Sequence, residues 1–283
     1  MDVFMSTHEI VRTKSLLNVY FDVCETTNHI VPSHWHKHLE LIFILRGTMH
    51  VISNEKNHTL HTKDLFIVNS GDIHYTRSVG KTKLLLLQIP YEFLNQIIFQ
   101  FDTIHFTEHF SYDQFQEDAH YQSIVKHLLV MEELYINQEE GYQFLFTSHL
   151  HLLLHILYTN YTSRHNMEQI TKEEKSLERI KEIIAYVEEH YMEPLTLQEV
   201  ADLFALNPEY FCRYFKKNTG FTFLQYVNMV RLPHIYEDII QTKDSITQIQ
   251  ERHGFSNYKI MNRMFKELYG CLPSEARKNS IQR

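Results

Sequence analysis

Two segments near the C-terminus repeat one another, and this repeat constrains the fold more than any other feature of the chain. Arg213-Tyr214-Phe215-Lys216 precedes Gly220, and 50 residues later Arg263-Met264-Phe265-Lys266 precedes Gly270. Each segment follows a short predicted helix, a tight turn and an asparagine that can cap a second helix, which is the plan of a helix-turn-helix unit. The sequence therefore predicts two successive helix-turn-helix units, for which double-stranded DNA is the expected partner.

Capping signals mark the helices of both units. Thr196 and Glu199 have the spacing of a capping box, in which each side chain bonds the backbone N–H at the other position. Asn207 precedes Pro208, and proline suits the first helical position because the N–H that it lacks would be unpaired there. The second unit repeats this plan with Ser245, Gln248 and Asn257.

Two further helices are expected around these units. Ser176 is predicted to cap a helix that ends before Pro194. A long helix from Gln225 to Thr242 should connect the two units, but Pro233 lies inside it. Because proline removes a backbone hydrogen bond, we expect it to kink or break this helix.

Length, composition and charge limit the class of protein. The chain has 283 residues, of which 43% are hydrophobic, so it can bury the cores of two domains. The net charge of −8 lies within residues 1–175, whereas residues 176–283 hold 14 basic and 14 acidic side chains. Attraction to phosphates must therefore come from local clusters such as Arg213, Lys216 and Lys217.

Cysteine usage and the absence of export signals favour a cytoplasmic protein. The three cysteines, Cys24, Cys212 and Cys271, are unclustered, which excludes a disulfide scaffold and fits free thiols in a reducing compartment. Met1 to Val11 lacks the pattern of a signal peptide, and no apolar run is long enough to span a membrane.

The N-terminal half changes from strand to helical periodicity. Short apolar and β-branched runs fill residues 18–90, among them Leu39–Leu45 and Met49–Ser53 on either side of an expected turn at Gly47. Such runs predict a small barrel or sandwich. Residues 119–158 predict two antiparallel helices with broad apolar faces. We therefore expect a two-domain α+β protein, with an N-terminal β-barrel and helical segment at residues 1–160, a linker at 161–175 and an all-α domain at 176–283.

The C-terminal domain resembles a known family of DNA-binding domains. Leu195 to Arg277, which contains LTLQEVADLFALNPEYFCRYFKKNTGFT and GFSNYKIMNRMFKELYGCLPSEAR, is similar to the DNA-binding domain of the AraC/XylS family of transcription regulators. The resemblance implies two recognition helices, Pro208–Lys217 and Tyr258–Glu267, in adjacent major grooves on one DNA face. The chain departs from the family pattern at Pro233, Gln250, Ile260, Met261 and Ala276.

Outward residues of these two helices are the predicted DNA contacts. Arg213 and Arg263 can each donate two parallel hydrogen bonds to guanine, and Asn262 can pair with adenine in the same way. The lysines of these helices are expected to contact phosphates of the DNA backbone. A solvated helix face is the alternative, but the recurrence of the cluster in both repeats favours DNA. The predicted DNA-binding residues are Glu209, Arg213, Lys216, Lys217, Tyr258, Lys259, Asn262, Arg263 and Lys266.

The N-terminal half resembles the sensor domain of the same family, a cupin-like barrel. His34, His36, Glu40 and Gly47 have the spacing of the first cupin motif, and residues 69–74, Asn-Ser-Gly-Asp-Ile-His, resemble the second. Strand alternation puts His34, His36, His38 and Glu40 on one face, and a barrel interior would gather them with His74.

Three interpretations of this cluster stay open. Three histidines and a carboxylate suit iron, manganese or zinc; they also suit the polar end of a ligand pocket, or a structural hydrogen-bond network. Similar regulators often keep the motif without metal, so we expect an effector pocket, no metal and no cofactor. Trp35 and Tyr75 flank the histidines and would suit stacking on a sugar. The predicted effector-binding residues are His34, Trp35, His36, Glu40, His74 and Tyr75.

Together these features predict a transcription regulator that is not an enzyme. A small-molecule effector, such as a sugar, would bind in the barrel, helices within 119–158 would form a homodimer, and the C-terminal domain would bind promoter DNA. The resemblance favours an activator, with RNA polymerase as a further partner. Two alternatives stay open: a metal-dependent cupin enzyme or metal sensor fused to a DNA-binding domain, and a ligand-independent regulator controlled by a protein partner.

Overall fold

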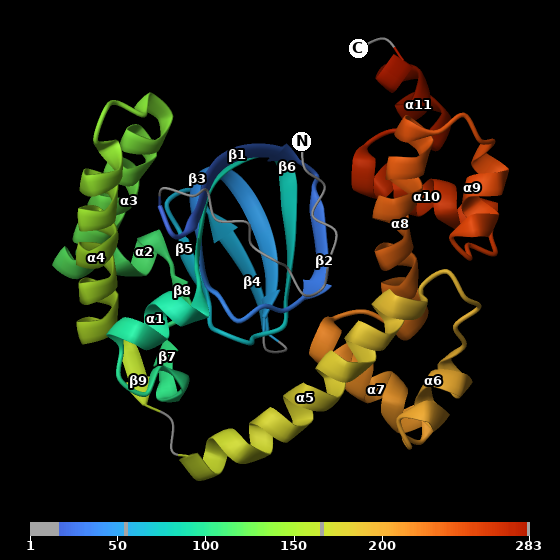
Figure 1. The fold of residues 1–283 in the computed structure, drawn as a ribbon, viewed down its shortest axis with the longest axis horizontal. Coiled ribbons are helices and arrows are strands. Elements are labelled where there is room, and N and C mark those ends of the chain that lie inside the picture. The colour runs from blue at the N-terminus through green and yellow to red at the C-terminus, as the bar shows by residue number, and fades with distance from the viewer. Residues whose placement is uncertain (1–16, 54–55, 165–166, 282–283) are drawn as a thin grey trace.

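The computed structural model describes residues 17–53, 56–164 and 167–281. The N-terminal segment Met1 to Val11, which we expected to lack a signal peptide, lies outside the described residues. A curved sheet occupies the middle of the molecule, with α3 and α4 on one side and an arc of helices from α5 to α11 on the other (Figure 1). The expected α+β fold with a β-rich N-terminal domain and a helical C-terminal domain is confirmed.

Antiparallel pairing builds the N-terminal sheet. Its strands are β1 (Tyr20–Thr27), β2 (Ile30–His34), β3 (Leu39–Ser53), β4 (Lys56–His61), β5 (Leu65–Val68), β6 (His74–Ile89) and β8 (His109–Phe110). A second small sheet pairs β7 (Ile104–Phe106) with β9 (Thr162–Arg164). The connecting helices are α1 (Tyr91–Ile97), η1 (Phe101–Thr103) and α2 (Tyr112–Phe115).

Strand β3 is longer than the sequence predicts. Leu39–Leu45 and Met49–Ser53 were expected as separate strands around a turn at Gly47, but they form one strand whose register shifts between Ile44 and Thr48. Gly47 has a φ of +101°, and a Cβ there would lie 2.8 Å from the carbonyl oxygen of Lys81. Glycine therefore permits a bulge within the strand rather than a turn between two strands.

Alternation along β3 separates two cores. Leu39, Leu41 and Phe43 face helices α3 (Ala119–Asn137) and α4 (Tyr142–Asn160), whose buried residues join the same core. Ile42 and Ile44 face the barrel interior. Glu40 shares this inward face by alternation, so the polar cluster lies at one end of an apolar interior.

The C-terminal half is entirely helical within the residues described. Its helices are α5 (Met167–His190), α6 (Leu197–Leu203), α7 (Pro208–Thr219), α8 (Phe223–Gln241), α9 (Ile246–Arg252), α10 (Tyr258–Tyr269) and α11 (Pro273–Ile281). The prediction that Ser176 caps the first of these helices is wrong, because α5 already begins at Met167. The segment 167–175 is rich in Glu, Lys, Gln and Met, which favour helix although the segment lacks an apolar period.

Helix α8 runs through Pro233 as one helix, so the expected break is wrong. Proline inside a helix costs about 3 kcal/mol. The helix is held on both sides of the proline, because Tyr226 and Val227 are buried in the core of the first unit, and Ile235 and Ile239 are buried in the core of the second. Burial of one large side chain contributes about 1.5–3 kcal/mol, so these four side chains together outweigh the cost of the proline.

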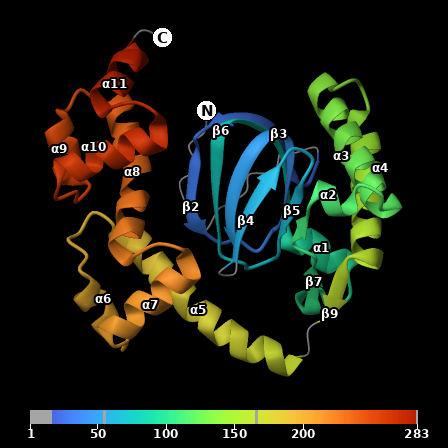
Figure 2. The same ribbon diagram turned by 180° about the vertical axis from the view of Figure 1, so that it is seen from behind.

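The barrel rests directly on the helical domain. Strand β2 lies beside α8 in both views (Figures 1 and 2). Ile73 of the barrel is buried in the core of the first unit, and Ile30 packs against the core of the second. Among the described residues, no helix is both long and apolar enough to cross a membrane.

Candidate DNA-binding surface and barrel site

Helix α7 presents the first predicted DNA-contacting face. Asn207 accepts hydrogen bonds from the backbone N–H groups of Glu209 and Tyr210, and Pro208 stands at the first helical position. Phe211 and Phe215 are buried and hold the helix in its core. The face opposite these two rings is exposed, and it carries Glu209, Arg213, Lys216 and Lys217.

Helix α10 repeats this arrangement. Asn257 accepts hydrogen bonds from the N–H groups of Lys259 and Ile260, and Met261 and Phe265 are buried. The exposed residues of the predicted set are Tyr258, Lys259, Arg263 and Lys266. The structure therefore brings both predicted basic clusters to helix surfaces that solvent reaches.

Asn262 is placed less favourably than the other predicted contacts. Its side chain is half-buried, and its Oδ1 is shielded from solvent without a hydrogen-bond partner. A contact between Asn262 and an adenine therefore requires the side chain to turn outward.

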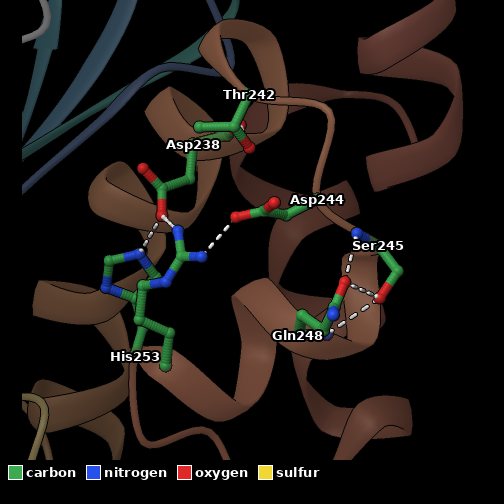
Figure 3. Close-up of polar contacts among 7 residues, drawn as sticks. Asp238, Thr242, Asp244, Ser245, Gln248 and His253 are labelled. Atoms are coloured by element: carbon green, nitrogen blue, oxygen red, sulfur yellow. Dashed lines mark hydrogen bonds and ion pairs between the residues drawn. The ribbon is translucent and has the colours of Figure 1, made fainter.

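Capping boxes set the first helix of each unit. The hydroxyl of Thr196 accepts from the N–H of Glu199, whose carboxylate accepts from the N–H of Thr196. Ser245 and Gln248 make the same reciprocal pair (Figure 3). Both predicted capping boxes are confirmed.

An ionic network fastens α9 to α8. A carboxylate oxygen of Asp238 accepts from Arg252 at 2.7 Å and from His253 at 2.9 Å (Figure 3). Arg252 also bonds Asp244. Burial opposes ionisation of Asp238, but the hydrogen bonds from His253 and Arg252 outweigh it and lower the pKa of this carboxyl group. This network therefore helps to orient the second unit on the connecting helix.

The basic end of α7 also borders the barrel. Arg213, Lys216, Lys217 and Gly220 line one side of an open hollow of about 490 Å³, and Ile52 and Asn57 of the barrel line the other. DNA bound to α7 would therefore pass close to the barrel end of β3 and β4.

Four of the predicted barrel residues meet in one buried cluster. His34, His36, His74 and Glu40 are all buried, and the His74 ring centroid lies 4.1 Å from that of His34 and 4.9 Å from that of His36. Nε2 of His36 lies 3.1 Å from Oε2 of Glu40. Burial lowers the pKa of His34 to about 4 and holds that of His74 well below its ordinary value. Both rings are therefore neutral near pH 7.

Gln88 belongs to this cluster, although sequence reasoning missed it. Its amide donates to Oε2 of Glu40 at 2.8 Å. Gln88 is a lone polar residue in the apolar run Leu84–Ile89, and that signal could have identified it.

Trp35 and Tyr75 do not flank the histidines as predicted. The Trp35 ring packs against the core of the first helix-turn-helix unit and lies 4.3 Å from the ammonium group of Lys181. The Tyr75 ring meets Phe221, with ring centroids 4.8 Å apart. Both residues alternate with inward histidines, so strand geometry turns them toward the helical domain. These positions contradict the prediction that the two rings flank the histidines and stack on a sugar.

Comparison with known proteins agrees with both domains. A helix-turn-helix domain family matches residues 200–279, and a cupin domain family matches residues 25–90. The uncharacterized HTH-type transcriptional regulator YdeC of Bacillus subtilis is 22% identical over 90% of this chain and 88% of its own length. The HTH-type transcriptional activator RhaS of Escherichia fergusonii is 24% identical over 87% of each chain.

Among solved structures, ToxT of Vibrio cholerae is 11% identical to this chain, with a TM-score of 0.44. The alignment covers 92% of this chain and 98% of the ToxT chain.

A cupin domain followed by two helix-turn-helix units defines a sequence-specific DNA-binding transcription regulator. These matches agree with the recognition made from the repeats, because the chain is similar to AraC-type transcription regulators in both of its domains.

Proposed function

We propose that the chain activates transcription by binding promoter DNA through α7 and α10, in response to a small effector held by the barrel. The observation that carries this proposal is the pair of capped helices, each with a buried apolar side and an exposed basic side. Arg213 and Arg263 occupy corresponding positions on these two sides. We propose these two arginines as the base-reading residues and the exposed lysines as phosphate contacts.

The polar end of the barrel is the proposed effector site. Its candidate residues are His34, His36, Glu40 and His74, while Trp35 and Tyr75 are better placed to connect that site to the helical domain. Apolar side chains fill the interior beyond the cluster, among them Ile42, Ile44, Val51 and Phe66. This filling favours an effector much smaller than a sugar ring.

A homodimer is proposed from the outer surface of α3 and α4. Leu129, Phe144, Leu145 and Leu152 are large apolar residues that remain exposed on these helices. Such a patch on a pair of long helices is typical of a protein interface. We propose further that the dimer works in the cytoplasm with RNA polymerase as a partner, and without catalysing a reaction.

Binding to selected DNA tests this function. The full chain is used to select duplexes from a random pool, and its affinity for a selected duplex is then compared with that for a scrambled duplex at one salt concentration. Specific binding should be tighter by about 10³-fold or more. Equal affinity for both duplexes would contradict the proposal, because it would leave only the salt-dependent attraction to phosphates.

A further inference from the structure

The turn after the first recognition helix is packed against the barrel. The Ser33 hydroxyl donates to the carbonyl of Thr219, the last residue of α7, at 2.6 Å, and the Tyr226 hydroxyl of α8 donates to the carbonyl of Ser33 at 2.9 Å. Gly220 follows α7, and a Cβ there would lie 2.8 Å from Cδ1 of Ile52 in β3. Close contacts of this kind leave little room for relative movement, so the edge of the barrel has a fixed place beside α7.

The outer face of the barrel continues from this contact. Ile52 pairs with one residue of β4 and one of β6, and the next outward residue of β3, His50, is paired in the same way. Val51 between them is buried, as strand alternation requires. Two neighbouring rows of outward residues result, which we call the outer rows: Asn57–Ile52–Tyr75 and Thr59–His50–Arg77.

The strands that carry the outer rows have no acidic residue near them in the sequence, although the whole chain has a net charge of −8. Asp and Glu are absent from residues 48–53, 56–61 and 74–83. Lys81 of β6 is paired with Glu25 at 2.8 Å. Arg77 of the same strand is exposed and forms no ion pair with any described residue. The charge of Arg77 is therefore available to an anion from outside the chain.

The open hollow of about 490 Å³ lies between the outer rows and α7, and its charge suits a polyanion. Helix α7 contributes three cations to it, and none of its described lining residues is acidic. Asn57 on the opposite wall is exposed, and its amide can donate to a phosphate oxygen. Arg77 lies two strands across and two residues along from Asn57, which is about 10 Å by about 7 Å. One strand of phosphates can therefore meet both side chains.

We propose that Asn57 and Arg77 of the barrel bind phosphates of the duplex that α7 enters, so that the N-terminal domain forms part of the DNA-binding surface. Charge complementarity selects this occupant, because a duplex is a polyanion and the exposed basic side of α7 brings one to the hollow. The inference rests on the proposed function and adds a second domain to its DNA contacts. Because the outer rows are already fixed beside α7, their binding costs little ordering.

Affinity of the full chain for selected and random duplexes, measured over a range of salt, tests these contacts. Phosphate contacts carry no sequence information, so Arg77→Ala and Asn57→Asp should each weaken binding to both kinds of duplex. The expected loss is about three- to tenfold, as for one charge-assisted hydrogen bond at an exposed site. Arg77→Ala should also lower the slope of log affinity against log salt by about 0.9.

Two control variants separate contact from a general effect of charge. Lys81→Ala removes the same charge from the same strand as Arg77→Ala. Asn95→Asp makes the same exchange as Asn57→Asp at an exposed position of α1, which lies on the side of the sheet away from α8 (Figure 1). Both controls should bind as the native chain does, because salt screens distant charges. Unchanged affinity in both Arg77→Ala and Asn57→Asp would overturn the proposal, and tighter binding would show instead that the barrel obstructs DNA.

Ethylation of single phosphates maps the contacts on the duplex. The native chain should show interference at phosphates next to the base pairs that Arg213→Ala no longer protects. Part of this interference should disappear in Arg77→Ala and in Asn57→Asp, while the base contacts of Arg213 persist. A pattern that matches the native one phosphate by phosphate in both variants would overturn the proposal.

Failure of this inference differs from failure of the proposed function. If the native chain prefers no selected duplex over random DNA, the proposed function fails, yet the smaller salt slope of Arg77→Ala on random duplexes still supports contact by the barrel. If the native chain binds a selected duplex specifically and the two barrel variants match it in affinity and in phosphate pattern, the proposed function stands and this inference is wrong.

Discussion

At the scale of single residues, Gln250 shows how a departure from the family pattern is accommodated. A small residue is usual there, yet Gln250 is buried, and its amide donates to the carbonyl of Phe255 at 2.7 Å. This hydrogen bond gives a buried partner to a backbone carbonyl in the turn between α9 and α10. The longer side chain therefore supports the second unit instead of loosening it.

The two kinds of basic residue on α7 should have different effects on DNA binding. We expect Arg213→Ala to weaken binding to a selected duplex by about 1–3 kcal/mol and to relax preference at one base pair, because a bidentate contact to guanine is lost. Lys216→Ala should weaken binding to all duplexes alike. It should also lower the salt dependence of the affinity by the amount expected for the loss of about one phosphate contact. Affinity titrations over a range of salt measure both effects.

Arg179→Ala on the exposed surface of α5 is the matched control for these two variants and should leave affinity unchanged. If Arg213→Ala weakened binding to random and selected duplexes equally, Arg213 would be a phosphate contact, and base reading by this residue would be excluded.

Residues whose roles are local could be predicted from the sequence, and those that depend on the packing between domains could not. Asn207, Asn257 and the two capping boxes are set by neighbours within three positions. Trp35 and Tyr75 were misplaced because the sequence does not show that a second domain covers the outer face of their strands. Asn262 is shielded for the same kind of reason, since its surroundings come from tertiary packing.

At the scale of elements, helices and strands with strong local signals were predicted correctly, whereas boundaries that depend on tertiary contacts were not. The helices of both helix-turn-helix units were predicted because their caps and apolar periods agree. Strand β3 was divided at Gly47 because a bulge and a turn have the same local signature, and only pairing with β6 distinguishes them. Pro233 was expected to break α8 because its cost is local, whereas the burial that offsets it is not.

Asp238, which joins α8 to α9, should give the protein a pH-dependent stability. The lowered pKa of a carboxyl group stabilises the fold above the ordinary value of 3.8, and this stabilisation is lost as pH falls through the lower value in the folded state. We expect Asp238→Asn to lower the free energy of unfolding at pH 7 by about 0.5–1 kcal/mol, because the network is partly exposed. The difference from the native chain should shrink in acid.

Urea unfolding followed at several pH values measures this effect, and Asp202→Asn, at an exposed position of α6, provides the control. A difference between native and Asp238→Asn proteins that stays constant from neutral pH into acid would contradict an ionic role for Asp238.

At the scale of the whole molecule, one prediction concerns the exposed apolar surface of α3 and α4. Phe144 has 75% of its surface exposed, so Phe144→Asp removes apolar contact area without disturbing a core. We expect the native full chain to sediment as a dimer at micromolar concentration and Phe144→Asp to sediment as a monomer. Phe99→Asp, at a residue that is 78% exposed and lies outside α3 and α4, should remain dimeric.

A monomeric native chain would reject this interface, and so would a Phe144→Asp variant that remains dimeric at low concentration. The second result would place the dimer contact on another surface of the protein.

The arrangement of the two domains was beyond prediction from the sequence. The cupin motifs and the repeats each identify a domain, but the contacts of Ser33 with Thr219 and Tyr226 join residues almost two hundred positions apart. Polar residues that look ordinary in each domain alone become buried at this contact. The arrangement therefore makes the barrel a direct neighbour of the recognition helix that it is proposed to regulate.

Base-specific footprinting of the full chain on a selected duplex tests the central claim most directly. Two helices that enter successive major-groove segments should protect two short base patches about 10–10.5 base pairs apart on one face of the duplex. Arg213→Ala should remove protection from one patch and Arg263→Ala from the other. A single protected patch, or two patches that fade together in either variant, would contradict reading by two separate helices.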